Sequence, residues 1–498
     1  MVRESPGRTT RRGVVKALGA GSLVGLAGCT GGGGGGGGSS DGSSGGDGSS
    51  GGSSGGDGSS GGGTTGSTGG SEWGDWSGLT LHFLTGESDE ASQSFWNQVT
   101  SDFAAETGAD IKVEYTGFGT ESVQRIAQLV QAGEAPTVNQ TSFEQTALFR
   151  SNDILVPLTG TFEDEVIPAI GEPNDPSRFP FEGEYYQVPF WNNIGDFFYR
   201  DDLAEEVGMD APDTWDAVLE YAEAVDGMRS GLNSSYVAAG QGSHAVAQLT
   251  SWLYSNGGRI VQRDGDGNLE VAIQSGKMRE KMVETLEFQR SLHEFSPEAS
   301  DSTWDTLASS MAQGTAACQW YVGFRPPIRS FRAEQDFAAN VRCLQHPKSP
   351  SGGRTGRGGA DGLAVFKNPD ENVEEMGRKF VAFMMRPKYL LDLYMSIAPV
   401  HNIPAYPEFQ QGDEYQNALK ELPYNAEDIA EYQEKVASDW ISYPAETEPP
   451  NPYVGSVFGR SPMWDMQTEV LVGGTDIDAA IDKYAPKIQA NLDEVSGQ

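Results

Sequence analysis

Short apolar runs alternate with amphipathic segments where the composition of the chain becomes globular. Residues 79–84 have the pattern of a strand, residues 111–115 alternate as a second strand, and residues 136–141 are expected to form a short third strand. Between these runs, apolar residues recur at helical spacing, and each helical pattern ends at a glycine, Gly108 or Gly133. This order of strand, helix, strand, helix, strand predicts a parallel α/β sheet.

The segments that follow these three strands are the first candidates for a ligand site. In parallel sheets, ligands bind beyond the carboxyl ends of the strands. The corresponding segments here are residues 85–88, 116–120 and 141–144. We therefore expect these three segments to face a common ligand.

Residues 183–221 form the stretch around which we expect the rest of the chain to be organised. A strand-like run over residues 188–191 continues into alternating apolar residues that end at Tyr199. A short acidic helix follows, then a turn at Ala211-Pro212, and a new helix begins near Thr214. We interpret this stretch as the first crossing between two lobes, with the ligand pocket beside it.

The pattern after this stretch predicts the start of a second lobe and further elements along the rest of the chain. Helices are expected around residues 215–225, 245–254, 278–286, 376–385 and 477–488, strands at 316–322 and 363–366, and a hairpin over 259–271. Residues 348–362, rich in glycine and arginine, are expected to form a loop. Residues 403–460, rich in proline and tyrosine, give no clear assignment.

The chain is strongly acidic, with a formal net charge of −37 over 498 residues. Such a charge repels phosphate groups, which argues against a nucleic acid partner and against docking of the protein surface on an anionic membrane. It keeps a protein soluble, but its self-repulsion destabilises the fold unless salt screens it. We therefore expect a halophilic source, and a fold whose stability rises from dilute buffer to molar salt.

The N-terminal residues 1–28 have the features of a twin-arginine signal peptide. The pair Arg11-Arg12 precedes a short apolar run that is too short to span a bilayer. Leu26-Ala27-Gly28-Cys29 resembles the lipobox of prokaryotic lipoproteins, which makes Cys29 the expected lipidated residue; the alternative is a cleaved signal with an incidental cysteine. Residues 29–72 then form a flexible linker dominated by glycine and serine. We expect a lipid-anchored protein on the extracellular face of the cell membrane.

Neither the other two cysteines nor the acidic turn in the sequence predicts a metal site. Cys318 and Cys343 could form a disulfide in an oxidising compartment or remain two buried thiols. The segment 264–270 has some residues of a calcium loop but lacks the long spacing to a bidentate glutamate, so we prefer a turn rich in Asp and Gly. No metal and no cofactor are expected.

Six motifs, in this order, resemble those of the extracellular solute-binding proteins of ABC importers, in particular the sugar-type family that includes the maltose-binding proteins. They are Ala104-Ala-Glu-Thr-Gly108, Gly183-Glu-Tyr-Tyr-Gln-Val-Pro189 with Phe198-Tyr-Arg-Asp-Asp-Leu203, Pro212-Asp-Thr-Trp-Asp216, Gln313-Gly-Thr-Ala-Ala317, Gly358-Gly-Ala-Asp-Gly-Leu363 and Gly473-Gly-Thr-Asp476. The resemblance spans residues 79–495. Cys318 stands where the family usually has methionine, and the basic segment around Arg354 and Arg357 has no counterpart that we can match.

The resemblance implies a two-lobed periplasmic-binding-protein-like α/β fold, in which each lobe is a sheet flanked by helices. Residues 73–190 with 362–400 would form lobe 1, and residues 191–361 with 401–498 would form lobe 2. The crossings between the lobes would lie near residues 188–198, 361–366 and 397–402. The implied function is capture of a sugar or oligosaccharide between the lobes and its delivery to membrane permease subunits, without enzymatic activity.

Sugar sites combine aromatic faces with carboxylates, amides and other polar groups. The aromatic and amide candidates are Trp191, Asn192, Asn193, Trp252, Trp320, Tyr321 and Phe324. The other polar candidates are Glu87, Ser142, Glu144, Asp361 and His401. Most of them have a structural alternative: the aromatic residues could pack the core, Glu87, Ser142 and Glu144 could cap helices, and His401 could lie in a solvated loop.

Other functions stay open at this point. A binding protein of the same family for glycerol phosphate or another polar solute would use the basic segment near Arg357. A secreted glycoside hydrolase would need two carboxyl groups about 5–10 Å apart across a cleft, and no pair in the sequence is marked for that role. A structural surface protein would account for the linker and the acidity but would bind no soluble ligand.

Overall fold

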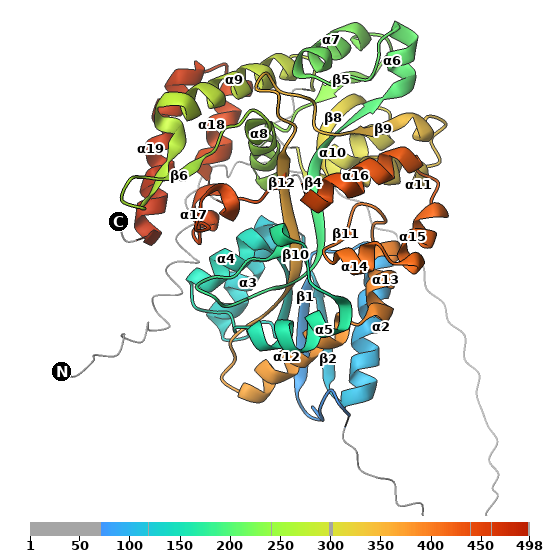
Figure 1. Cartoon of the computed structure of the whole chain (residues 1–498), viewed down its shortest axis with the longest axis vertical. Coiled ribbons are helices and arrows are strands. Elements are labelled where there is room, and N and C mark those ends of the chain that lie inside the picture. Colours follow the sequence, from blue (N-terminus) through green and yellow to red (C-terminus); the bar gives the residue numbers. More distant parts are fainter. Residues whose placement is uncertain are drawn as a thin grey trace, which may run out of the picture.

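The computed structural model describes residues 71–117, 119–240, 242–297, 302–438, 440–459 and 461–496. The predicted signal peptide, Cys29 and nearly all of the predicted linker lie outside these residues. Two groups of helices and strands occupy the two ends of the long axis, and two long strands run between them (Figure 1).

The first lobe contains the predicted parallel sheet. Its strands are β1 (Thr80–Thr85), β2 (Asp110–Tyr115) and β3 (Val138–Ser142), and both β2 and β3 pair with β1 in parallel. The helices α2 (Glu90–Thr107), α3 (Thr120–Ala132) and α4 (Phe143–Ser151) follow the three strands. The prediction for this region is confirmed.

Local sequence explains where α2 begins and ends. The side chain of Asp89 accepts hydrogen bonds from the backbone N–H groups of Ala91 and Ser92, which have no partner inside the helix. Gly108 ends the helix with φ 75°, a left-handed conformation that glycine adopts without strain. The buried residues Phe95, Trp96, Val99 and Phe103 then form one face of α2 against the sheet.

Two antiparallel strands, β4 (Val188–Arg200) and β10 (Gly356–Val365), join the lobes. The sheet order is β2-β1-β3-β10-β4-β8-β5, where β5 is Asn233–Tyr236 and β8 is Ala316–Val322. The first half of β4 pairs with β10, and its second half pairs with β8 and with β9 (Val341–Leu344). The predicted first crossing is therefore confirmed as one continuous strand.

The second crossing begins earlier than predicted, because residues 356–362 are part of β10 and not of a loop. Glycines allow this strand to pack where other residues would clash. A Cβ atom added to Gly362 would lie 2.1 Å from the carbonyl oxygen of Val188, and one added to Gly358 would lie 2.3 Å from the ring of Trp440. The glycine content therefore reflects close approach of the backbone to its neighbours.

The third predicted crossing, residues 397–402, does not form a strand. Residues 397–402 form a turn in which Val400 has φ 68°, and only the short strand β11 (Ile403–Pro404) pairs with β4. The chain after β11 first packs on lobe 1: the N–H of Ala405 donates to the carbonyl oxygen of Phe190, and the ring of Phe409 contacts Tyr394. We therefore propose that the return to lobe 2 falls after Lys420 and not at residue 401.

The remaining elements flank the sheet and complete the two lobes. Around lobe 1 and the hinge lie α5 (Ile167–Ile170), α12 (Glu371–Met384), α13 (Pro387–Ser396), α14 (Pro407–Gln410) and α15 (Asp413–Lys420). Around lobe 2 lie α6 (Asp201–Val207), α7 (Trp215–Val225), α8 (Ser243–Ser255), the hairpin β6 (Val261–Arg263) and β7 (Leu269–Val271), α9 (Gly276–His293), α10 (Trp304–Ala312), α11 (Arg325–Arg332), α16 (Ala426–Ser438), β12 (Trp440–Ile441), α17 (Val454–Phe458), α18 (Ser461–Leu471) and α19 (Ile477–Ser496). The predicted hairpin and the predicted helices are confirmed, with α12 in lobe 1, and residues 403–460 prove to be largely helical.

The two cysteines of lobe 2 are buried free thiols. Cys318 lies on β8 and Cys343 on β9, and β4 runs between these two strands. Since neighbouring strands lie about 4.8 Å apart, the two residues are separated by about 10 Å, which is too far for a disulfide. Of the two sequence alternatives, the structure favours the pair of thiols.

Candidate ligand-binding cleft

Solvent reaches the two crossing strands at only a few positions. Every residue of β4 is buried except Asn193, and every residue of β10 is buried except Arg357 and Asp361. In the antiparallel register Asp361 faces Trp191, and Gly359 faces Asn193. Because side chains alternate between the faces of a strand, Asn193, Arg357 and Asp361 share one face. This face of the crossing strands is the floor of the candidate cleft.

All three segments predicted to face a ligand approach lobe 2 around this floor. After β1, a carboxylate oxygen of Glu87 accepts a hydrogen bond from Nη2 of Arg325 at 2.7 Å. After β3, Glu144 accepts from Nη2 of Arg357 at 2.6 Å. After β2, a Cβ atom added to Gly119 would lie 3.2 Å from Oγ of Ser243. The two lobes therefore touch on several sides of the floor.

The indole of Trp191 and the carboxyl group of Asp361 form the centre of the hinge. Nε1 of Trp191 donates to Oδ2 of Asp361 at 2.9 Å, and the ring packs edge-on against Phe190 with centroids 4.3 Å apart. Only 1% of Trp191 is exposed. Its packing is therefore that of a core residue, and we propose that it acts on a ligand by positioning Asp361.

Asn192 and Asn193 point to opposite faces of β4. Asn192 is fully buried and bonds to the segment before the strand, since its Oδ1 accepts from Oγ of Ser177 at 2.7 Å. Asn193 is the partly exposed residue on the cleft floor. The sequence named both, and the structure leaves only Asn193 as a candidate for ligand contact.

The aromatic candidates divide into two groups. Trp252 packs against Trp215, Phe288 and Phe197, and Phe324 packs against Phe198 and Tyr432. Both belong to the core of lobe 2. Core packing was the alternative to ligand binding that the sequence offered for these residues. In the sequence, an aromatic residue of the core cannot be distinguished from one that lines the cleft, because both are large and apolar.

Trp320 and Tyr321 belong to an aromatic group beside the cleft floor. The ring of Trp320 lies directly on the backbone of Gly195, where an added Cβ atom would approach Cζ2 to 2.3 Å. Trp304, at the start of α10, packs against both residues and is partly exposed. Its Nε1 donates to Oγ of Ser243 at 3.3 Å. Trp304 is thus the accessible ring of this group, and the sequence analysis missed it.

The polar candidates pair with two arginines that the sequence analysis did not select. Nε of Arg325 donates to Nε2 of His401 at 3.1 Å, so His401 and Glu87 are brought together by one guanidinium group. Burial lowers the pKa of His401 far below its usual range, and the nearby Arg325 acts in the same direction. His401 is therefore a neutral, buried acceptor and not a solvated loop residue.

Ser142 and Glu144 were each predicted either to cap a helix or to contact a ligand, and the structure separates them. Ser142 is the N-cap of α4, with a reciprocal capping box to Gln145, so its side chain has a structural role. Glu144 lies in the first turn of α4 but reaches across to Arg357, whose guanidinium group lies 4.9 Å from the ring centroid of Tyr443. Arg357 was assigned to a loop in the sequence, so its place in the cleft could not be predicted.

Asp361 has an unusual protonation equilibrium. The pKa of its carboxyl group is raised to about 7, chiefly by burial; the hydrogen bond from Trp191 and the charge of Arg357 act to lower it, and the charges of Glu144 and Glu87 act to raise it. At neutral pH this carboxyl group is therefore present both protonated and ionised, so it can donate as well as accept a hydrogen bond.

Asp361→Asn is expected to remove a pH dependence of stability. The folded protein holds the Asp361 proton more tightly than the unfolded chain does, so this group stabilises the fold most below about pH 4 and loses that contribution as the pH rises to about 7. Urea denaturation of both proteins at pH 5 and pH 7.5 should show the variant gaining relative to the parent at the higher pH. Asp213→Asn, at an exposed residue, is the control, and parallel behaviour of Asp361→Asn and the parent would contradict the assignment.

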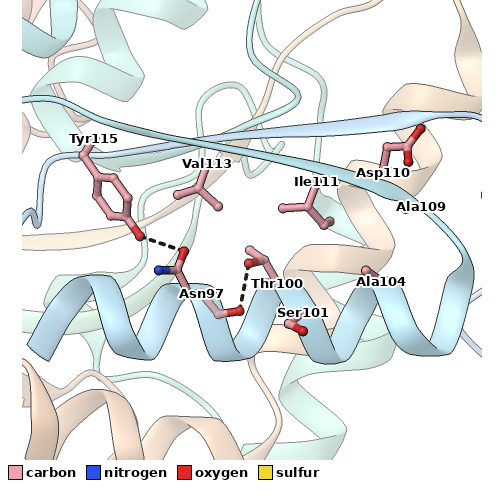
Figure 2. Close-up of a pocket in the computed structure, with 9 residues that line it drawn as sticks. All are labelled: Asn97, Thr100, Ser101, Ala104, Ala109, Asp110, Ile111, Val113 and Tyr115. Atoms are coloured by element: carbon pink, nitrogen blue, oxygen red, sulfur yellow. Dashed lines mark hydrogen bonds between the residues drawn. The ribbon is translucent and has the colours of Figure 1, made fainter. Parts of the chain in front are cut away.

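A second concavity lies in lobe 1, between α2 and the edge strand β2 (Figure 2). It has a volume of about 530 Å³ and is lined by small and apolar side chains together with Asn97 and Tyr115, whose hydroxyl donates to Oδ1 of Asn97 at 3.2 Å. Because it lies beside the sheet and not at the carboxyl ends of its strands, it is separate from the candidate cleft.

The described residues lack two other kinds of feature. Among them, no group of three or more His, Cys, Asp or Glu side chains is arranged to hold a metal ion. Within the same ranges, no helix has the length and apolar character needed to cross a bilayer. The turn at 264–268 is a hydrogen-bonded turn, in which Asp264 accepts from the backbone of Asp266 and Asn268.

Solved structures with the same architecture are numerous. An ABC transporter solute-binding protein from Thermotoga lettingae TMO, bound with α-D-tagatose, is 20% identical and has a TM-score of 0.68, covering 83% of this chain and 100% of that one. Maltose-bound MalE3 of T. maritima has the same coverage and TM-score at 18% identity. A sugar transporter structure from Arthrobacter chlorophenolicus A6 with bound laminaribiose is 16% identical, with a TM-score of 0.67, and covers 83% of this chain and 98% of that one.

These similarities show a shared two-lobed fold. No curated protein sequence matches the chain at a significant level. The family model described as bacterial extracellular solute-binding protein matches residues 98–423, which include both crossing strands and most of the cleft. The chain therefore belongs to the family of bacterial extracellular solute-binding proteins.

Proposed function

We propose that the protein is the substrate-binding component of an ABC importer, and that it captures a sugar or oligosaccharide between its lobes and delivers it to membrane permease subunits. The observation that carries this proposal is the convergence of the partly exposed positions of β4 and β10 with Glu87 and Glu144 of lobe 1. Carboxylates and guanidinium groups suit sugar hydroxyls, and Trp304 offers a ring face beside them.

Unsatisfied polar atoms beside the cleft support a ligand rich in hydrogen-bonding groups. Nε1 of Trp320, Nε of Arg357 and Nδ1 of His401 are buried and have no hydrogen-bond partner among the described residues. Buried polar groups normally find partners. The bound tagatose, maltose and laminaribiose of the similar structures point to the same class of ligand.

The proposal includes attachment at the cell surface. The twin-arginine signal, the lipid on Cys29 and the halophilic source rest on the sequence alone, and the family is extracellular by its description. A lipid anchor followed by a flexible linker would let the folded domain move over the membrane to meet the permease. Fractionation of the full chain into membrane and soluble material tests the anchor.

A sugar screen by thermal shift tests the proposed function. A ligand that binds only the folded protein raises the melting temperature by mass action. We expect at least one of a panel of monosaccharides, disaccharides and oligosaccharides to raise the melting temperature of the purified full chain in a concentration-dependent way, and the same sugar to bind in calorimetry. No shift with any of them would contradict the sugar assignment, and turnover of a bound oligosaccharide would show a glycoside hydrolase instead.

A further inference from the structure

The charged side chains around the cleft floor are matched in pairs across the lobes. Glu87 and Glu144 come from the carboxyl ends of β1 and β3, and each meets one arginine of the other side, Arg325 or Arg357. The side chain of Glu87 is 6% exposed and that of Glu144 is 17% exposed, so both pairs are largely shielded from solvent. Shielding strengthens each charge's effect on its neighbours.

A third carboxyl group makes the balance acidic. Asp361 shares the cleft face with Arg357. The charges of Glu144 and Glu87 both act to raise the pKa of its carboxyl group. The cleft therefore holds three carboxyl groups, of which Asp361 is partly protonated at neutral pH, against two guanidinium groups. Neighbouring arginines do not change this balance, because Arg354 pairs with Asp213 at 2.5 Å and Arg329 pairs with Asp305 at 2.7 Å.

We propose that these carboxyl groups make the cleft selective for uncharged polyhydroxylated ligands, and that Glu87 and Glu144 exclude uronic acids and phosphate esters by occupying the two arginines. This inference rests on the proposed function and narrows its ligand class. Arg357 in the basic segment would otherwise favour glycerol phosphate, but its guanidinium group is already committed to Glu144.

This selectivity is expected because each ion pair can form hydrogen bonds with a hydroxyl group but disfavours the binding of an anionic group. A sugar hydroxyl can donate to the carboxylate and accept from the guanidinium group of the same pair, so both charges keep their partner. A ligand carboxylate or phosphate would have to displace Glu87 or Glu144 from its arginine, and it would then leave two anions close together in a shielded site. Such an arrangement carries a large electrostatic penalty.

Matched pairs of neutral and acidic sugars test the proposal on the full chain. The probes are glucose with glucuronate, galactose with galacturonate, the neutral sugar that gives the largest thermal shift together with its uronic acid, and glycerol with glycerol phosphate. We expect each neutral sugar that binds to do so at least about tenfold more tightly than its acidic counterpart in calorimetry at constant ionic strength. Acidic sugars or glycerol phosphate that bind as tightly as the neutral probes, or more tightly, would overturn the inference and leave the solute-binding function intact. Absence of binding by every probe would overturn the proposed function and the inference with it.

Glu144→Gln is the variant that separates charge from shape. It keeps the size of the side chain but frees the charge of Arg357, so the preference for the neutral partner should fall to about threefold or less. Glu182→Gln is the matched control, because it breaks the Arg150–Glu182 ion pair, which also involves α4 but leaves Glu182 84% exposed. An unchanged preference in Glu144→Gln would contradict the role of this residue. Should that variant fail to fold, Glu87→Gln makes the same test at Arg325.

Discussion

Replacing Lys435 with methionine is expected to lower the free energy of unfolding by about 3–5 kcal/mol, because it leaves a charged partner buried without compensation. Lys435 lies on α16 and its ammonium group pairs with the carboxylate of Asp196 on β4. The two side chains are 2% and 1% exposed. Asp196 lies on the opposite face of β4 from the cleft, so this pair supports the hinge from behind.

The effect of Lys435→Met should depend on pH in a defined direction. Burial raises the pKa of Asp196 to about 6 even with Lys435 present, and removal of the lysine charge raises it further. The folded variant therefore binds a proton that the unfolded chain binds only at lower pH, and its stability should fall as the pH rises from about 4 through about 6 and beyond. Denaturation with urea at pH 5 and pH 8 should show the larger loss at pH 8.

Two variants control this measurement. Lys388→Met removes an ammonium group that lies 3.3 Å from Asp102 but is 68% exposed, so it should cost less than about 1 kcal/mol. The double variant Asp196→Asn with Lys435→Met removes both charges and should recover at least about half of the single variant's loss. A single variant as stable as the parent would show that the pair contributes nothing to the fold.

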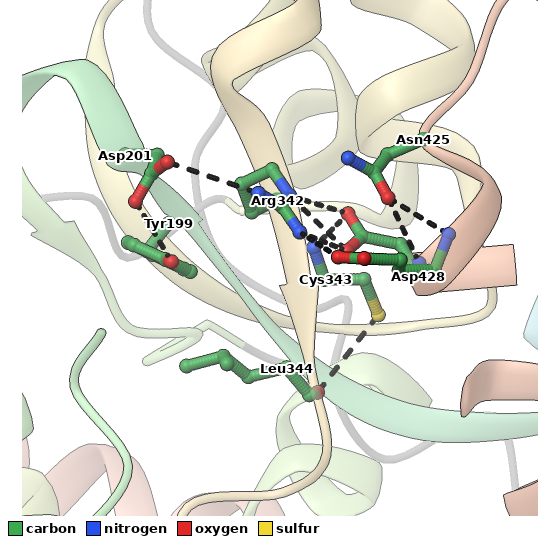
Figure 3. Close-up of polar contacts among 8 residues, drawn as sticks. Tyr199, Asp201, Arg342, Cys343, Leu344, Asn425 and Asp428 are labelled. Carbon is green, nitrogen blue, oxygen red and sulfur yellow. Dashed lines mark hydrogen bonds and ion pairs between the residues drawn. The ribbon is translucent and has the colours of Figure 1, made fainter. Parts of the chain in front are cut away.

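The position of α16 does not depend on Lys435 alone. At the start of this helix, Asp428 accepts hydrogen bonds from Nε of Arg342 at 3.0 Å and Nη2 of Arg342 at 2.8 Å, and from the backbone N–H of Cys343 at 3.0 Å (Figure 3). These hydrogen bonds hold the N-terminal end of the helix on β9 without any contribution from Lys435. The variant should therefore retain its fold, and the measured loss should report the buried pair.

Trp191→Ala is expected to destabilise the protein by about 3–5 kcal/mol, as other buried tryptophan truncations do. If Trp191 stacked on a ligand instead, its truncation would lower ligand affinity by about 1–3 kcal/mol, from lost burial and stacking. With 1% of its surface exposed and its ring packed on Phe190, Trp191 contributes more to the hinge than to a ligand surface. Denaturation of the ligand-free protein should therefore show a larger effect than calorimetry with a sugar.

Trp191→Phe is the matched control for this residue. It retains an aromatic ring in the hinge but removes the hydrogen bond from Nε1 to Asp361, so it should cost about 1–3 kcal/mol. If Trp191→Ala lowers sugar affinity strongly while the ligand-free stability is unchanged, the ring faces the ligand and the hinge assignment is wrong.

Local patterns in the sequence were sufficient for lobe 1 and for the first crossing. The alternation of strands with helices that end at Gly108 and Gly133 is a property of short segments, so it could be recognised without any tertiary contact. The same patterns placed the segments after β1, β2 and β3 at one edge, and all three do face lobe 2. The three carboxyl groups of the cleft were also among the predicted residues.

Tertiary structure decided which of those residues lie in the cleft and what they contact. The cleft pairs Glu87–Arg325 and Glu144–Arg357 join residues 238 and 213 positions apart, and Asp196–Lys435 joins residues 239 positions apart, so no local pattern could reveal them. Residues 356–362 form a strand because the neighbouring backbone and Trp440 leave room only for glycine at key positions, which periodicity cannot show. Trp191, Trp252 and Trp320 are alike in sequence, and only packing separates the hinge, the core and the cleft wall. The sequence by itself therefore determined the elements of lobe 1, the first crossing and the kind of protein, because these follow from local spacing and motifs. The partners of each charge and ring, by contrast, follow from the way in which distant segments meet.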